Sequence, residues 1–198
     1  GRLLDAERFG ATVLQAQQAF GEANSLVLSN GDAVSASIFE SAIAKDEPTI
    51  SALNAIGVDS FTIGNHEFDH GADDLTNRIS PHTSGPDLAA NITAADGSHP
   101  CEEYAIFDVN GISVGVIGAV TSETPALSAA GSTGNLTFGD PVAAVNRVAA
   151  QLSDGDASNG EADVLVASYH EGGPASDVPL AENEGSAVFA HIVNDTDA

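Results

Sequence analysis

Three apolar runs of this chain each end in a metal-capable polar residue. The residues, with the run that precedes each, are Asp32 after Leu26–Leu28, Asn65 after Phe61–Ile63 and His170 after Val164–Ala167. In α/β proteins, ligands bind beyond the carboxyl ends of the strands, so we expect these side chains to meet there. A carboxylate, an amide and an imidazole together suit a divalent ion such as Mn²⁺, Fe²⁺ or Zn²⁺.

The run Phe61–Ile63 is followed by the highest local concentration of polar residues among the three. Gly64 allows the backbone to turn sharply at the end of the strand. Asn65 then offers an amide oxygen to a hard cation, and His66 offers an imidazole. Glu67 and Asp69 follow at once, and we expect them to orient their neighbours or cap the loop. The alternative is an ordinary strand-to-helix turn in which Asp69 caps the next helix.

Strand and helix patterns alternate along the chain and predict an α/β fold. Tyr104–Val109 and Ile112–Val120 are joined by Asn-Gly, which predicts a hairpin with a type I′ turn and therefore a mixed sheet. A further strand is expected at Asp87–Ile92, where Asn91 is interpreted as a structural amide. Helices are expected at 5–20, 38–44, 46–56, 73–79, 140–152 and after Ser186. The pattern indicates two packed sheets flanked by helices.

The composition limits the class of protein. The 198 residues are enough for one domain with a sizeable core, and 42% of them are hydrophobic. Twenty-nine acidic residues against five basic ones give a net charge of −24, which repels nucleic acid and anionic membranes. We therefore expect no stable nucleic-acid partner. No run of 18 apolar residues predicts a membrane span. The single cysteine, Cys101, is interpreted as a structural thiol.

The polar motifs resemble those of a known family. Gly31-Asp32, Gly64–Glu67 and His170 look like the middle three of five motif blocks in the calcineurin-like metallophosphoesterases. Ser35–Ser41, the Gly64 block and Ala89–Ile92 resemble the 5′-nucleotidase branch, especially its secreted bacterial members. The resemblance implies a four-layer α/β/β/α sandwich. It also implies an extracellular, cell-surface or periplasmic location.

The same resemblance implies two-metal phosphoester hydrolysis. Two divalent cations (Mn, Zn, Fe, Co or Mg) roughly 3.5–4 Å apart would activate a water and neutralise the phosphoryl oxygens. Asp32 would bridge the two ions, and Asn65 and His170 would ligate the second. His66 would face the phosphate, where it stabilises charge or protonates the leaving alkoxide. Asn65 and His66 are thus the expected substrate contacts. Nucleoside monophosphates are the first substrates to consider, and the oligomeric state stays open.

Two blocks of the family pattern do not occur in this sequence. These are an Asp-x-His block at the first strand and a Gly-His-x-His block near the end of the domain. Gly1–Leu4 looks like the tail of an Asp-Phe-His-Gly-Arg-Leu stretch, and Ile192–Ala198 looks like the approach to the last block. We therefore expect residues 1–198 to be a truncated catalytic domain without the nucleobase-binding C-terminal domain. Weak metal binding and little turnover are expected of these residues alone.

Other functions are compatible with the sequence. A phosphodiesterase, a nuclease or a sulfur-ester hydrolase of the same superfamily would carry the same motifs. A non-catalytic acidic binding module would keep the fold and lack the outer motifs. In a salt-adapted, cation-buffering surface protein, the charge of −24 would itself be the function.

Overall fold

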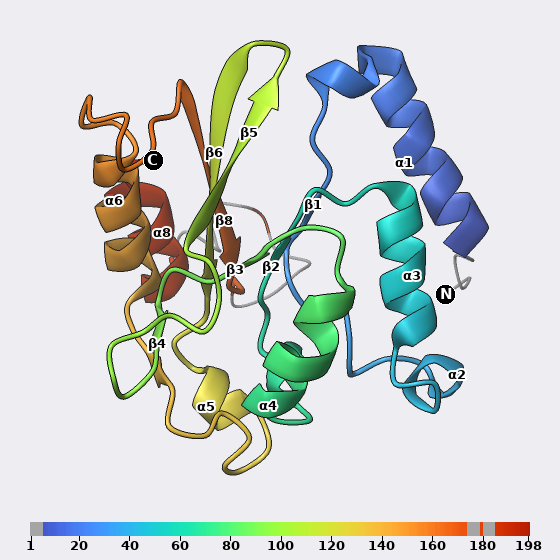
Figure 1. Ribbon diagram of the computed structural model, residues 1–198. Helices are drawn as coiled ribbons and strands as arrows, with labels where there is room; N and C mark the ends of the chain where they lie inside the picture. The colour runs from blue at the N-terminus through green and yellow to red at the C-terminus, as the bar shows by residue number, and fades with distance from the viewer. Residues whose placement is uncertain (1–5, 174–178, 180–184) are drawn as a thin grey trace.

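Two three-stranded sheets lie between two groups of helices in the computed structural model (Figure 1). The structure describes residues 6–173, 179 and 185–198. The Gly1–Leu4 stretch and the predicted helix start at Asp5 lie outside these residues. The order of layers is α6 and α8, then the sheet β5-β6-β8, then the sheet β1-β2-β3, then α3 and α1. This is the four-layer α/β/β/α sandwich that the resemblance implied.

The first sheet is parallel and carries two of the three motif residues. It consists of β1 (Leu28–Ser29), β2 (Ser60–Thr62) and β3 (Asp87–Leu88), in that spatial order. The helix α3 (Glu47–Ile56) connects β1 to β2 and ends at Gly57, whose φ of 82° provides the left-handed C-terminal stop. All three residues of β2 are buried, because sheet and helix cover both of its faces.

The second sheet is mixed, as the hairpin predicted. β5 (Tyr104–Val109) pairs antiparallel with β6 (Ile112–Val120), and β6 pairs parallel with β8 (Val164–His170). The turn residues Asn110 and Gly111 have φ values of 54° and 84°, as a type I′ turn requires. His170 is the last residue of β8, so it lies at the carboxyl end of this sheet.

The strand predicted at Asp87–Ile92 is divided in two. Only Asp87–Leu88 belong to β3, whereas β4 (Ile92–Thr93) pairs antiparallel with β7 (Thr137–Phe138). Asn91 lies at the division. Its Nδ2 donates to the carbonyls of Val120 and Gly139 at 2.7 and 2.9 Å, and its Oδ1 accepts from Val120 N–H at 3.0 Å. Its interpretation as a structural amide is confirmed.

Helix α6 (Pro141–Gln151) covers the second sheet together with α8 (Ala187–Asp195). Asp140 caps α6 by accepting from the backbone N–H groups of residues 142 and 143. Ser186 caps α8 in the same way through Phe189 N–H.

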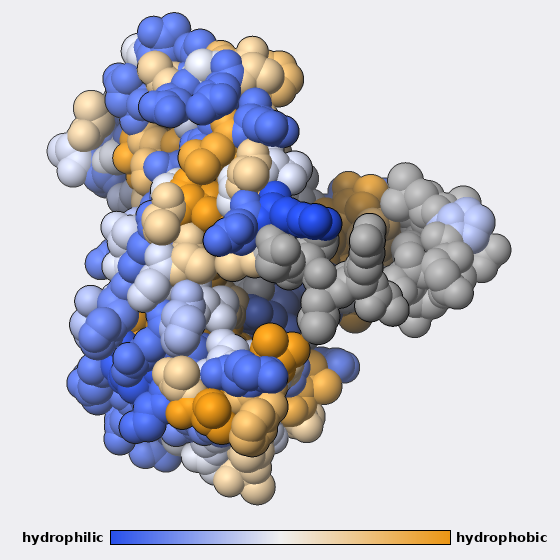
Figure 2. All heavy atoms as spheres, turned by 90° about the vertical axis from the view of Figure 1, so that its right-hand side faces the viewer, coloured by the Kyte–Doolittle hydropathy of each residue, from blue (hydrophilic) through white to orange (hydrophobic). Residues whose placement is uncertain are grey.

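The first helix is less buried than its apolar pattern indicated. α1 (Ala6–Phe20) packs against α3 at Gly10, its only buried residue. Phe9 is 47% exposed and Phe20 is 76% exposed, so the apolar side of this helix faces solvent. Figure 2 shows the side of the molecule that carries α1, where apolar atoms form separate patches on a largely hydrophilic surface. The apolar periodicity therefore predicted the helix but not its burial.

Short elements complete the described fold. They are α2 (Phe39–Ala42), α4 (Ala72–Asp74), a π-helical turn (Leu75–Ile79), α5 (Thr124–Leu127) and the 3₁₀ turns Glu22–Asn24, His66–Phe68 and Ser80–His82. The predicted helix at 73–79 is thus α4 and the π-helical turn in succession. Cys101 is buried, and burial raises the pKa of its thiol to about 12, as fits a structural role. In the described part of the chain, no helix is both long and apolar enough to cross a membrane.

Candidate metal centre

Asp32, Asn65 and His170 converge at the carboxyl ends of three strands. They follow β1, follow β2 and end β8, so the cluster draws on both sheets. His170 Nε2 lies 3.2 Å from Asn65 Oδ1 and 3.3 Å from Asp32 Oδ2. The structure therefore brings together the three residues that the sequence placed at strand ends.

The ring of His170 is fixed by its other nitrogen. His170 Nδ1 lies 2.7 Å from the backbone carbonyl oxygen of Asn30. A carbonyl can only accept, so Nδ1 carries the hydrogen, and a neutral ring then presents a lone pair at Nε2. That lone pair faces the oxygens of Asp32 and Asn65. Histidines that bind metals typically donate their second ring N–H to a carbonyl or carboxylate in this way.

The donor set fits a divalent cation. Nitrogen and oxygen ligands lie about 2.0–2.2 Å from an ion such as Zn²⁺, so neighbouring ligands of one ion lie about 2.8–3.6 Å apart across octahedral and tetrahedral geometries. The separations of His170 Nε2 from Asn65 Oδ1 and Asp32 Oδ2 fall in this range. Among the described residues, no group of three or more His, Cys, Asp or Glu side chains is positioned for a metal. The cluster of Asp32, Asn65 and His170 contains only two such side chains, because its third donor is the amide of Asn65.

The buried carboxylate of Glu67 holds the two motif loops together. It accepts from the backbone N–H groups of Asp32, Ala33 and Gly64 at 3.0, 2.7 and 2.7 Å. The residue is 3% exposed, and this burial raises the pKa of its carboxyl group although the backbone hydrogen bonds act in the opposite direction. Glu67 thus orients the loops, as the sequence predicted.

Two glycines allow the loops to approach this closely. A Cβ on Gly64 would lie 2.3 Å from Asp32 Oδ1, and one on Gly31 would lie 2.3 Å from His170 Nδ1. Gly31 also has a φ of 91°, which side chains rarely permit. Only glycine fits at either position without displacing a member of the cluster.

His66 lies beside the cluster and forms a pair with Asp69. Its Nδ1 lies 2.7 Å from Asp69 Oδ2, and its backbone N–H donates to Asp32 Oδ1 at 3.0 Å. The bond to Asp69 raises the pKa of the His66 imidazole, with partial burial acting against it. Because the carboxylate accepts from Nδ1–H, the Asp69 pair directs Nε2 away from itself as the group available for proton transfer.

The charges of the cluster favour one another. Partial burial opposes ionisation of Asp32, but hydrogen bonds from Nε2–H of the protonated His170 ring and from His66 N–H outweigh it and hold the pKa of Asp32 below its ordinary value. The hydrogen bond to Asp32 raises the pKa of the His170 imidazole, against the effect of burial. Asp32 is therefore an anion at neutral pH, the state in which a carboxylate binds a cation.

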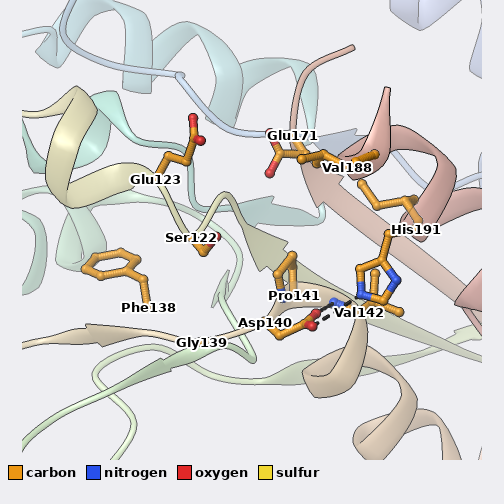
Figure 3. Close-up of a pocket in the computed structure, with 12 residues that line it drawn as sticks. Ser122, Glu123, Phe138, Gly139, Asp140, Pro141, Val142, Glu171, Val188 and His191 are labelled. Carbon is orange, nitrogen blue, oxygen red and sulfur yellow. Dashed lines mark hydrogen bonds and ion pairs between the residues drawn. The ribbon is translucent and has the colours of Figure 1, made fainter. Parts of the chain in front are cut away.

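A pocket of 420 Å³ is lined in part by the residue that directly follows β8 (Figure 3). Glu171, which directly follows His170, lies on its wall with Glu123, Phe138 and Asp140. His191 also lines the pocket, and its Nε2 lies 3.2 Å from Asp140 Oδ2. Three carboxylates thus line the pocket beside apolar side chains such as Phe138, which suits a neutral or cationic organic group better than an anionic one.

Three of the other histidines take part in contacts outside the cluster. His82 Nδ1 lies 2.6 Å from the carbonyl of Arg78, and His99 faces Glu103. His191 contacts two aspartates near the pocket. Sequence reasoning assigned no role to Asn30, whose contacts with β8 span about 140 residues and leave no local pattern. An asparagine directly before the Gly-Asp motif was the only available signal.

Curated proteins similar in sequence to this chain include a nucleotidase and an endonuclease. A 5′-nucleotidase of Vibrio cholerae is 33% identical over 148 residues, which are 74% of this chain and 26% of the relative. The endonuclease YhcR of Bacillus subtilis is 34% identical over 141 residues, which are 65% of this chain and 12% of the relative. The chain thus spans about a quarter or less of the length of these two curated relatives. No protein-family model matches it.

Solved structures show the same fold. The calcineurin-like phosphoesterase YfkN of Bacillus subtilis superimposes with a TM-score of 0.69 and 26% identity, over 96% of this chain and 61% of the other. A putative 5′-nucleotidase from Staphylococcus aureus gives a TM-score of 0.73 and 27% identity, over 95% and 37%. The chain belongs to the calcineurin-like phosphoesterases. Within them, its sequence relatives include 5′-nucleotidases and an endonuclease.

Proposed function

We propose that this protein is a metal-dependent phosphoester hydrolase of the 5′-nucleotidase type. The observation that carries the proposal is that His170 Nε2 lies 3.2 Å from Asn65 Oδ1 and 3.3 Å from Asp32 Oδ2. Three lone pairs that face one another at such distances need a proton or a cation between them. Relatives named 5′-nucleotidase support the reaction class.

In this proposal Asp32, Asn65 and His170 are metal ligands. A pair of divalent ions, whether Mn, Zn, Fe, Co or Mg, would supply an activated water and neutralise the phosphoryl oxygens. Asp32 would be the ligand that the two ions share. The hydrogen bond from His66 N–H to Oδ1 orients this carboxylate so that Oδ2 faces His170. Asn65 and His66 contact the substrate phosphate, and protonated His66, oriented by Asp69, donates a proton to the leaving oxygen.

The substrate we propose is a phosphomonoester, with nucleoside monophosphates first. Three carboxylates, Glu123, Asp140 and Glu171, line the pocket that begins at the residue after His170, and they disfavour a second phosphate group there. A relative named endonuclease makes phosphodiesters the second candidate. Relatives named as a snake venom enzyme and a cell wall protein support a location outside the cytoplasm.

The test is hydrolysis of AMP, a chromogenic phosphomonoester and a chromogenic phosphodiester in Mn²⁺. It should use this chain and a longer one that adds Asp-x-His and Gly-His-x-His blocks. We expect turnover chiefly from the longer chain, and His66→Ala should lower kcat by about 10²–10⁴-fold. His82→Ala is the matched control, since the His82 ring contacts the carbonyl of Arg78 and lies outside the cluster.

The outcomes separate the candidates. If only the diester is hydrolysed, the protein is a phosphodiesterase and the 5′-nucleotidase assignment is wrong. Mn²⁺ binding without hydrolysis of any ester would favour the acidic binding module. If Asp32→Ala leaves both Mn²⁺ binding and turnover unchanged, the proposed metal centre is wrong.

A further inference from the structure

Asn30 contacts three consecutive residues of β8 at the edge of the candidate metal centre. Its Nδ2 donates to the carbonyl of Tyr169 at 2.9 Å, and its Oδ1 accepts from Ser168 Oγ at 2.8 Å. Its backbone carbonyl faces His170 Nδ1 at 2.7 Å. One residue that follows β1 is therefore joined to the end of β8 through both side-chain atoms and its main chain.

We propose that Asn30 is a positioning residue for His170. Its side chain anchors the Asn30 main chain against β8, so that the Asn30 carbonyl keeps the His170 ring in the Nδ1–H tautomer. Nε2 is then left bare and directed at Asp32 and Asn65. This inference rests on the proposed function, in which that nitrogen is a metal ligand.

The side chain is needed because the next residue does not fix the carbonyl. The Asn30 carbonyl belongs to the peptide plane shared with Gly31, which has a φ of 91° and no side chain to restrict it. A peptide plane next to glycine can rotate at low cost unless something holds it. The two side-chain bonds of Asn30 to Ser168 and Tyr169 supply that restraint.

The anchor continues into the core. Ser168 Oγ, which donates to Asn30, accepts in turn from Thr62 Oγ1 at 2.6 Å. Thr62 lies in β2 and is 2% exposed, so its position is held by the packing of the core. The hydrogen-bond chain Thr62–Ser168–Asn30 thus connects β2, β8 and the end of β1, the three strands that carry the proposed ligands.

The experiment compares Asn30→Ala and Ser168→Ala with the unmodified chain by two measurements. Mn²⁺ affinity is measured by titration, and the ring ¹⁵N shifts of His170 are measured by NMR without metal, at a pH where the ring is neutral. Asn30 is exposed, so its truncation should leave the core folded. Asn24→Ala is the matched control, because Asn24 is exposed and its Nδ2 donates to the Phe20 carbonyl rather than to a residue of β8.

We expect Asn30→Ala to weaken Mn²⁺ binding about tenfold or more. The His170 ring should change from a single Nδ1–H form to a mixture with the Nε2–H form. Ser168→Ala should produce smaller changes in the same direction, since the bond from Asn30 Nδ2 to Tyr169 remains. The control Asn24→Ala should change neither quantity.

A purely structural role would give a different result. If the Asn30 and Ser168 variants lose thermal stability but keep the Mn²⁺ affinity and His170 ring shifts of the unmodified chain, the proposal is overturned. If Asn30→Ala does not fold, the same two readouts in Ser168→Ala decide. If neither this chain nor the longer one binds Mn²⁺, the proposed function is contradicted, whereas the metal-free ring shifts still test the role of Asn30.

Discussion

The carboxylate of Glu67 accepts a hydrogen bond from the backbone N–H of Asp32 at 3.0 Å, across 35 residues of sequence. The same group accepts from Gly64 N–H at 2.7 Å, so one buried side chain holds the loops that follow β1 and β2. Since Asp32 has a left-handed φ of 55°, its position depends on such support.

Replacing Glu67 by glutamine should therefore destabilise the fold. The amide keeps one acceptor oxygen but turns an NH₂ group toward backbone N–H donors. We expect a loss of about 2 kcal/mol in the free energy of unfolding, measured by urea denaturation, because hydrogen bonds to a buried charged group are lost. Glu40→Gln, at an exposed position, is the control. Equal midpoints for the two variants would contradict the role given to Glu67.

Gly64→Ala should displace Asp32. The new Cβ would lie 2.3 Å from Asp32 Oδ1 and 2.5 Å from Asp32 N, so the loop must shift. We expect Mn²⁺ affinity to fall about tenfold or more, as when a group supporting a ligand is lost. Gly139→Ala is a suitable control, since its Cβ would meet only a carbonyl at 3.6 Å. Unchanged Mn²⁺ affinity in Gly64→Ala would show that the loop is more adaptable than the structure indicates.

Asn91→Ala should lower the free energy of unfolding and leave Mn²⁺ binding unchanged. Asn91 is 4% exposed, and its amide joins the end of β6 to the start of α6 through Val120 and Gly139. Its removal leaves buried backbone groups unpaired, for which we expect a loss of about 2–3 kcal/mol. Thermal or urea unfolding checks the size of the loss. A simultaneous loss of Mn²⁺ binding would mean that the two regions are coupled.

The Asp74–Arg78 pair should make stability depend on pH in acid. Arg78 donates to both carboxylate oxygens of Asp74 at 2.6 Å, and this bond lowers the pKa of Asp74 below 3.8 in spite of partial burial. A lowered folded-state pKa contributes stability above the unfolded-state pKa, and this contribution disappears as the pH falls through the folded-state value. Asp74→Asn should therefore cost about 1 kcal/mol at pH 7 and progressively less in acid.

The matching variant is Arg78→Gln. Its cost should largely repeat that of Asp74→Asn rather than add to it, apart from the bond of Arg78 to the Lys45 carbonyl. Urea titrations at several pH values provide the measurement. If the loss of unfolding free energy caused by Asp74→Asn grows as the pH falls, the proposed contribution of this ion pair is contradicted.

Local sequence was sufficient for the parts of the fold that local chemistry determines. The Asn110-Gly111 turn and the helices expected at 46–56 and 140–152 depend on residues a few positions apart, and each was predicted. Asp32, Asn65 and His170 were predicted together because parallel strands align their carboxyl ends. The family resemblance added their expected roles, which remain proposals.

Features that depend on distant partners were not predictable in this way. The division between β3 and β4 follows from contacts of Asn91 with Val120 and Gly139, far along the chain. Phe9 and Phe20 are exposed because α1 packs against α3 only around Gly10. The contact of Asn30 with β8 likewise requires the two sheets to be packed before it exists.

The candidate centre takes two of its residues from one sheet and one from the other. A cation held by Asp32, Asn65 and His170 would therefore act as a cross-link between the halves of the sandwich. Ion binding and separation of the sheets would be linked equilibria, since any opening that parts β1 from β8 destroys the site. Occupancy would then slow hydrogen exchange deep in both sheets, so the ion would contribute to the cohesion of the fold as well as to its chemistry.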